Sequence, residues 1–198
     1  MEHIDIGHPD ACELVSHAIQ RLTLSFTFSS ISFRWLRLDG RANTRTLLAH
    51  CGPALTSLSL NLSAFYNDDK GEGANVPDFG VRHCPNLARV ALGLADPLES
   101  WGVLKRVLVQ LFAAGERTRC IELQLALPPS ALAHVGAFDE VLAPYVPERV
   151  GTVRILAKLS AGNAEAGALE AVARPLSGWE QEIVRERLPS VSKGVLCF

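Results

Sequence analysis

Residues 55–60, Leu55-Thr56-Ser57-Leu58-Ser59-Leu60, contain the pattern that decides the fold. Apolar residues stand at the first, fourth and sixth positions of this stretch, and small polar residues stand between them. Alternation of this kind is typical of a β-strand with one buried face. The same pattern returns further along the chain, at Leu87-x-x-Val90-x-Leu92, Cys120-x-x-Leu123-x-Leu125 and Val150-x-x-Val153-x-Ile155.

The copies of this strand pattern are almost evenly spaced, since their first positions lie 32, 33 and 30 residues apart. A period of about 30 residues is typical of repeat proteins, in which each unit buries its apolar side against its neighbours. Weaker copies are assigned upstream and at the end of the chain, at Ile19-Leu22-Leu24, at Phe33-Leu36-Leu38 and near Leu196 and Phe198.

The residues that lead into two of these strands predict a helix before each strand. Residues 47–55 and 81–87 both pass from an apolar stretch through a His-Cys pair and a proline to the first strand leucine. Proline cannot continue a helix, so each helix is expected to stop near the cysteine. Further helices are predicted from Asp96 to about Ala114, from about Gly136 toward Val141, from Asn163 through Val172, and from Ser177 to a point before Pro189.

Helix, turn and strand repeated in one direction predict a mainly parallel sheet with helices on its outer face. The expected fold is therefore α/β, a leucine-rich-repeat-like solenoid that forms a single repeat domain over residues 1–198. The short interval between the two weak upstream copies predicts an N-terminal hairpin over residues 19–38. We also expect a disordered start at residues 1–18 and a mobile, polar and glycine-rich loop at residues 64–79.

Residues 47–60 and 82–92, where a His-Cys pair and a proline precede a leucine strand, resemble the leucine-rich repeats of fungal F-box proteins. The tail from Trp179 through Pro189 to Leu196 is similar to the closing helix and strand of the same group. The resemblance implies a horseshoe-like sheet and a substrate-receptor role in a cullin-type ubiquitin ligase. About eighteen residues precede the first strand-like segment, too few for an F-box, so a ligase adaptor would be reached through a missing module.

Composition and charge argue against several classes of protein. The formal net charge is −2 and no block of like charge occurs, which argues against a nucleic-acid partner. No apolar stretch approaches the roughly 20 residues that span a bilayer, and no secretory signal is visible. The five cysteines are widely spaced and, without an export signal, are expected to be reduced. We therefore expect a cytoplasmic or nuclear protein with no membrane partner.

The pairs His50-Cys51 and His83-Cys84 are the strongest candidates for chemistry, because a thiol beside an imidazole can act as a nucleophile or a metal ligand. Adjacent residues on a helix point about 100° apart, which favours packing of the cysteines in the core instead. We predict no catalytic residue and therefore no enzyme. A small α/β enzyme with a site near His50 or His83, and a truncated non-catalytic remnant, stay open as alternatives.

Cofactor and metal motifs are also missing from the sequence. His3, His8, Cys12 and His17 match no closed zinc module, and the residues after Asn67 lack the ligand spacing of a calcium loop. No dinucleotide-binding, phosphate-loop or nucleophile-elbow sequence occurs. We therefore predict no metal and no cofactor.

The third, fifth and seventh positions of each strand are expected to face away from the helices. In a solenoid this face is an open concave surface that commonly binds another polypeptide, although polar residues also lie there simply because the face is solvated. Arginine and aromatic side chains are enriched at binding hot spots, so Trp35, Arg37 and Arg89 are the best individual candidates. The candidate protein-binding residues are Trp35, Arg37, Asp39, Ser57, Ser59, Asn61, Arg89, Glu122, Gln124 and Arg154.

The predicted function is a protein-binding leucine-rich-repeat scaffold with an unidentified protein partner. The resemblance extends this prediction to a substrate-recognition part of an F-box-type ubiquitin ligase.

Overall fold

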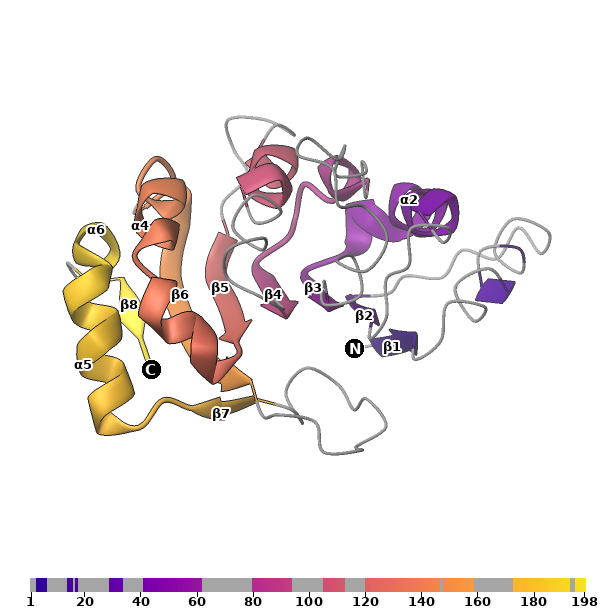
Figure 1. Ribbon diagram of the computed structural model, residues 1–198. Helices are drawn as coiled ribbons and strands as arrows, with labels where there is room; N and C mark the ends of the chain where they lie inside the picture. Colours follow the sequence, from indigo (N-terminus) through magenta and orange to yellow (C-terminus); the bar gives the residue numbers. More distant parts are fainter. Residues whose placement is uncertain are drawn as a thin grey trace, which may run out of the picture.

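The structure is a computed structural model that describes residues 3–6, 14–15, 17, 29–33, 41–61, 80–93, 105–112, 120–146, 148–158, 173–192 and 195–198. These residues form an eight-stranded sheet with helices packed against it (Figure 1). The strands are β1 (His3–Ile6), β2 (Ser30–Phe33), β3 (Ser57–Asn61), β4 (Arg89–Gly93), β5 (Cys120–Leu127), β6 (Val150–Lys158), β7 (Ala173–Pro175) and β8 (Leu196–Cys197).

The strands β1 to β7 lie side by side in the order in which they occur in the sequence. Each neighbouring pair from β1 to β6 is parallel. β7 runs antiparallel along one end of the outer edge of β6, and β8 pairs in parallel with the same strand. The chain is therefore α/β with a mostly parallel, mixed sheet, and within the described residues this sheet does not close into a barrel.

The apolar strand positions are aligned across the centre of the sheet, as the sequence predicts. The fourth and sixth positions of successive strands lie opposite one another, and each of these side chains is at most 1% exposed. Burial of one such side chain stabilises the fold by about 1.5–3 kcal/mol, and a slip of one residue would expose a whole row. The two rows are Leu58, Val90, Leu123 and Val153, and Leu60, Leu92, Leu125 and Ile155.

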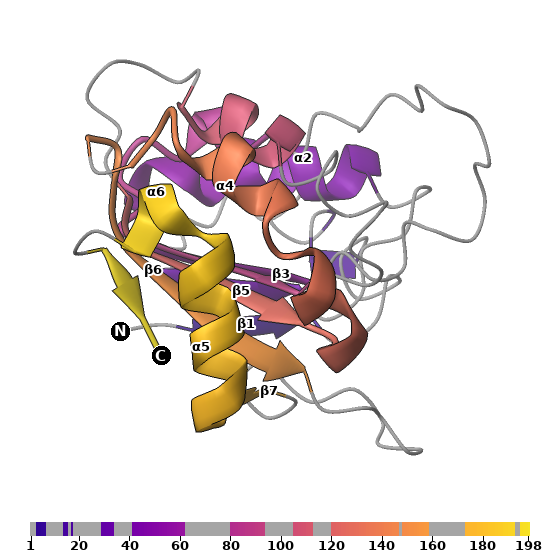
Figure 2. The same cartoon turned by 60° about the vertical axis from the view of Figure 1, so that its left-hand side comes forward.

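Helices cover the apolar face of the sheet. α2 (Arg41–Cys51), the helical residues 105–112 and α4 (Ala137–Leu142) form a layer on one side of the strands, and Figure 2 shows this layer from a second direction. Short 3-10 helices lie between them, η1 (Gly52–Ala54), η3 (Val81–His83) and η4 (Pro129–His134). α5 (Gly178–Arg187) and α6 (Pro189–Ser192) lie with β8 at the β6 end of the sheet.

Helix ends agree closely with the prediction wherever the structure describes them. α2 ends at Cys51 because Pro53 follows, and η3 ends at His83, directly before Cys84. The short α4 occupies the range expected from about Gly136, and α5 begins after Ser177 with the predicted capping box. The helix predicted from Asp96 is described over residues 105–112, which are helical, and the helix predicted from Asn163 lies outside the described residues.

The N-terminal part differs from the prediction. β2 pairs in parallel with β1 on one edge and with β3 on the other, so neither edge is left for an antiparallel partner. The hairpin expected over residues 19–38 is therefore wrong at Ser30–Phe33, and residues 19–28 and 34–38 lie outside the described part. Phe33 does not begin a strand pattern but ends β2, opposite Leu60. β1 falls within residues 1–18, for which we expected disorder, and the loop predicted at residues 64–79 is not among the described residues.

Candidate binding face of the sheet

The face of the sheet that points away from the helix layer contains two rows of aligned residues. Alternate residues of a strand point to opposite faces, so these rows lie opposite to the buried leucine rows. The third-position row is His3, Ser30, Ser57, Arg89, Glu122 and Thr152. The fifth-position row includes Ser59, Ala91, Gln124, Arg154 and Cys197. All of these residues are half-buried or exposed, and we call the two rows together the polar face.

The same pair of backbone hydrogen bonds forms where β3 and β4 begin, and we call the residues that lead into a strand its entry. These bonds hold the rows in register. The Ser29 carbonyl accepts hydrogen bonds from the amides of Thr56 at 2.9 Å and Ser57 at 3.0 Å. One unit later, the Thr56 carbonyl accepts hydrogen bonds from the amides of Ala88 at 2.9 Å and Arg89 at 3.0 Å. The two strand entries therefore have the same geometry, and side chains at equivalent positions are brought next to each other.

Side chains add further hydrogen bonds between successive units. The Asn86 amide donates from Nδ2 to the Pro53 carbonyl at 2.7 Å, across a separation of 33 residues. The Thr56 hydroxyl donates to the Ser29 carbonyl at 2.9 Å, across 27 residues. Both bonds join one strand entry to the entry before it, so the stacking of units is specified by polar as well as apolar contacts.

Three charged residues meet where β4, β5 and β6 form the polar face, and we call Arg89, Glu122 and Arg154 the Arg–Glu–Arg cluster. Arg89 Nε lies 3.6 Å from Glu122 Oε2, and Arg154 Nε lies 3.4 Å from Glu122 Oε1. The Gln124 amide donates from Nε2 to Glu122 Oε1 at 3.0 Å. The side chains of Arg89 and Arg154 are 72% and 43% exposed, whereas that of Glu122 is 16% exposed. The carboxylate is therefore held in the sheet surface, whereas the Arg89 side chain is mostly and the Arg154 side chain partly open to solvent.

The ion pairs of this cluster contribute little to folding. Exposed ion pairs stabilise a protein by about 0–1 kcal/mol, because water screens them and two long side chains must be ordered. One carboxylate also leaves a net positive charge when two guanidinium groups share it. The cluster is thus a chemically distinct patch on an open face rather than a support of the fold.

The structure brings six of the predicted binding residues together on the polar face, which are Ser57, Ser59, Arg89, Glu122, Gln124 and Arg154. Asn61 lies at the end of β3, opposite Gly93. Trp35, Arg37 and Asp39 lie outside the described residues.

Sequence reasoning missed the polar positions of the first strands. His3 and Ser30 belong to the third-position row, and His3 Nδ1 lies 3.0 Å from the Ser30 hydroxyl oxygen in a hydrogen bond. The available signal was the stretch Ser30-Ile31-Ser32-Phe33, which has the same alternation as residues 57–60.

The two His-Cys pairs do not form an ionised thiol site. Cys51 and Cys84 are buried, and burial raises the pKa of both thiols. The pKa of Cys84 reaches about 12 through burial and, to a smaller extent, through repulsion by Cys51. A thiol of this kind stays protonated at neutral pH and is a poor nucleophile and metal ligand. The cysteines pack in the core, as expected, while His50 is exposed and His83 half-buried.

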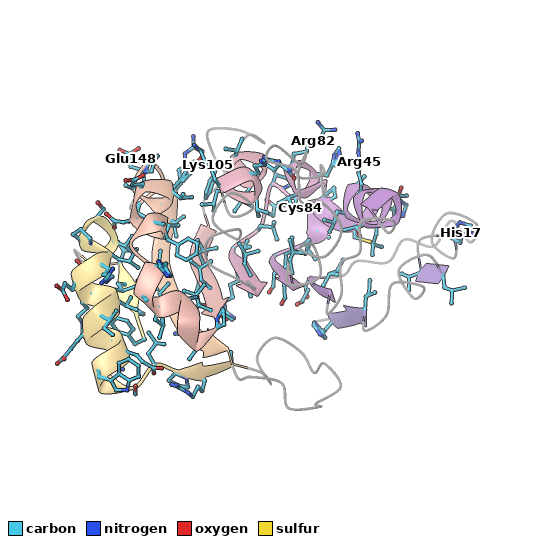
Figure 3. The ribbon with its side chains drawn as sticks, viewed as in Figure 1. His17, Arg45, Arg82, Cys84, Lys105 and Glu148 are labelled. Carbon is cyan, nitrogen blue, oxygen red and sulfur yellow. The ribbon has the colours of Figure 1, made fainter. Side chains whose placement is uncertain are left out.

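Figure 3 shows Cys84 between the helix layer and the strands, with Arg45, Arg82 and Lys105 on the outer side of that layer. Within the described part of the chain, no group of three or more His, Cys, Asp or Glu side chains could hold a metal ion. In the same residues, no helix is long and apolar enough to cross a membrane.

Comparison with known proteins gives no relative for this chain. No protein-family model matches it, and neither the curated proteins nor the solved structures yield a significant match.

Proposed function

We propose that this chain is a protein-binding scaffold of the leucine-rich-repeat type, in which the polar face of a solenoid-like sheet recognises another polypeptide. β1 to β6 follow one another in sequence order and in parallel, and β3 and β4 begin with the same pair of backbone hydrogen bonds. Both features are expected of a stack of similar units. The proposed place of action is the cytoplasm or the nucleus.

The observation that carries this proposal is the Arg–Glu–Arg cluster on the polar face. Arg89, with a mostly exposed side chain, and Arg154, with a partly exposed one, lie on the strands that flank Glu122. Arginine is enriched at protein interfaces, because its planar group pairs with carboxylates and stacks on aromatic rings. Ser57, Ser59 and Ala91 beside the cluster are small, so a bound chain can approach the sheet closely.

The resemblance of residues 47–60 and 82–92 to F-box repeats extends the proposal to a cellular role. In that role, the polar face recognises a substrate of an F-box-type ubiquitin ligase, and a separate module contacts the ligase adaptor.

Site-specific photo-crosslinking tests the binding role of the polar face. A photoreactive amino acid at Ser59 or Gln124 should capture the same polypeptide from an extract, because both positions lie on the polar face. The matched control is Ala49, an exposed position of α2 in the helix layer, from which that polypeptide should not be captured. Equal capture from Ala49 would contradict the proposal.

Charge reversal provides the second arm of this test. The double substitution Arg89→Glu and Arg154→Glu should reduce capture from Ser59 at least about fivefold, because the partner then meets like charge. Arg82→Glu reverses a charge on the outer side of the helix layer and should leave capture unchanged (Figure 3). The wild type, the double variant and the Arg82→Glu variant should each unfold cooperatively on heating, so that a loss of capture is not a loss of folding.

A further inference from the structure

The two arginines of the cluster converge on one carboxylate from opposite sides. β4 and β6 flank β5, and neighbouring strands lie about 4.8 Å apart, so Arg89 and Arg154 start from strands about 10 Å apart. Each Nε approaches a different oxygen of Glu122. Both Nε atoms therefore lie against the same carboxylate, which connects the two arginine side chains across β5.

Glu122 does not satisfy both arginines. Its Oε1 atom already accepts a hydrogen bond from Gln124 at 3.0 Å. Arg154 Nε is buried and has no hydrogen-bond partner among the described residues, although it lies 3.4 Å from that oxygen. Each guanidinium has five N–H donors, and a bidentate carboxylate uses two of them. The cluster therefore has a surplus of donors and a surplus of positive charge.

From this geometry we propose that the Arg–Glu–Arg cluster selects an acidic segment of the partner. The segment is an extended polypeptide with two carboxylate side chains separated by one residue. Side chains two residues apart in an extended chain point to the same side and lie about 6.8 Å apart, so each can reach one guanidinium. This inference rests on the proposed function and adds the chemistry of the ligand to it.

The residues beside the cluster support an extended chain as the ligand. Ser57 and Ser59 on β3 and Ala91 on β4 are small, so a peptide backbone can lie over them next to Arg89. The acidic side chains of such a peptide would contact the arginines where the small, uncharged residues of β3 and β4 adjoin the Arg–Glu–Arg cluster. A partner with lysines at these positions would place like charge against two guanidinium groups, at a cost in affinity.

The direct test measures binding of capped, fluorescein-labelled octapeptides to the full chain by fluorescence anisotropy. One peptide has two glutamates separated by one residue, and a second has the same composition with the glutamates adjacent. The alternating peptide should bind at least about fivefold more tightly, because adjacent side chains point to opposite sides. A peptide with lysines in place of the glutamates should not bind measurably. Equal affinity for the alternating and adjacent peptides would overturn the proposal.

The proposal predicts opposite changes in peptide affinity for substitutions of the two arginines and of Glu122. Arg89→Gln and Arg154→Gln should each weaken binding of the alternating peptide about fivefold. Glu122→Gln should tighten it about threefold, because the internal carboxylate no longer competes for the guanidinium groups. Arg82→Gln on the outer side of the helix layer is the matched control and should leave the affinity unchanged. Arg89 is 72% exposed, so its substitution should not impair folding.

A purely structural role of Glu122 gives the opposite result. In that case Glu122→Gln weakens binding or leaves it unchanged while it lowers the thermal midpoint, and the proposal fails. Displacement of the alternating peptide by inorganic phosphate at millimolar concentration would also overturn it, because the cluster would then be a general anion site.

Failure of this inference is distinguishable from failure of the proposed function. If crosslinking from Ser59 captures a partner but the acidic peptides do not bind, the polar face binds protein without the proposed preference. If Ser59 and Gln124 capture nothing that Ala49 does not, the binding role of the polar face fails as well.

Discussion

Gly52 is a residue at which one unit approaches the next closely. A Cβ atom at this position would lie 2.3 Å from the His83 carbonyl oxygen and 2.9 Å from Cys84 Sγ. Neither neighbour can move easily, because one is backbone and the other is a buried side chain. The glycine therefore permits the end of α2 to pack directly on η3.

Gly52→Ala should lower the free energy of unfolding by roughly 2 kcal/mol, because the added methyl group forces the two units apart. Urea unfolding followed by circular dichroism measures this change. Gly178→Ala is the matched control, since a Cβ there has nothing within 4 Å, and it should be neutral or slightly stabilising at the start of α5. Equal stability of the wild type and the Gly52 variant would show that the units are not packed in this way.

At the scale of one element, the start of α5 depends on a buried carboxylate. Glu180 is 1% exposed. It accepts hydrogen bonds at 2.7 Å from both terminal nitrogens of Arg174, and from the amide and the hydroxyl of Ser177. These bonds, with the Arg174 bonds contributing most, lower the pKa of Glu180 to about 2. The carboxylate thus connects β7 to the first turn of the helix.

The ionised form of Glu180 should stabilise the fold above the ordinary glutamate pKa of 4.5 and lose that effect as the pH falls toward 2. Glu180→Gln should therefore lower the free energy of unfolding at neutral pH by roughly 2 kcal/mol and flatten its decline in acid. Urea unfolding across the acid range measures both effects. Glu182→Gln changes an exposed carboxylate on the same helix and should alter neither.

The sequence prediction identified the central strands and missed the two N-terminal strands. β3 to β6 were identified because Leu58, Leu60 and their equivalents alternate with polar residues and follow an apolar residue at the first position of the pattern. The pattern also fits the sequence at β1 and β2, as Met1-x-x-Ile4-x-Ile6 and Phe28-x-x-Ile31-x-Phe33. The sequence prediction assigned the pattern instead to Ile19-Leu22-Leu24 and Phe33-Leu36-Leu38, which led to the wrong hairpin.

The polar face was predictable, but the charge cluster on it was not. Alternation along a strand is enough to place Arg89 and Glu122 on the face away from the helices. The approach of Arg154 to Glu122 depends on a diagonal contact, since the residue directly opposite Arg154 is Gln124. Contacts of this kind follow from the side-chain conformations adopted on the folded sheet, which a strand pattern does not contain.

At the scale of the whole molecule, residues 173–192 and 195–198 cover one end of the sheet. β7 and β8 both pair with β6, and Leu176, Val184, Leu188 and Val191 are buried there. Arg187 donates from Nη1 to the Ala133 carbonyl at 2.9 Å, and the Ser190 amide donates to Asp139 Oδ1 at 3.0 Å. This segment thus covers both the edge of β6 and the apolar surface beside α4.

Deletion of residues 173–198 should make the chain self-associate, because it uncovers the β6 edge and the apolar residues beneath α5 and α6. Size-exclusion chromatography with light scattering, at matched concentrations of the deleted and full-length chains, measures the change. Trp179→Ala removes an exposed apolar side chain of the same segment without uncovering β6, and should behave like the wild type. A deleted chain with the mass distribution of the full-length protein would contradict this role of the segment.

Because the parallel strands are aligned, each position of the polar face is defined by two coordinates. One coordinate is the strand, which advances by about 4.8 Å per unit, and the other is the position along that strand, which advances by about 6.6 Å for every second residue. The buried side chains that hold the strands in register, such as Leu58 and Leu60, lie on the opposite face of the sheet from the outward side chains, such as Ser57 and Ser59. A point mutation at an outward position can therefore change one side chain of the polar face without disturbing the buried residues that hold the strands in register.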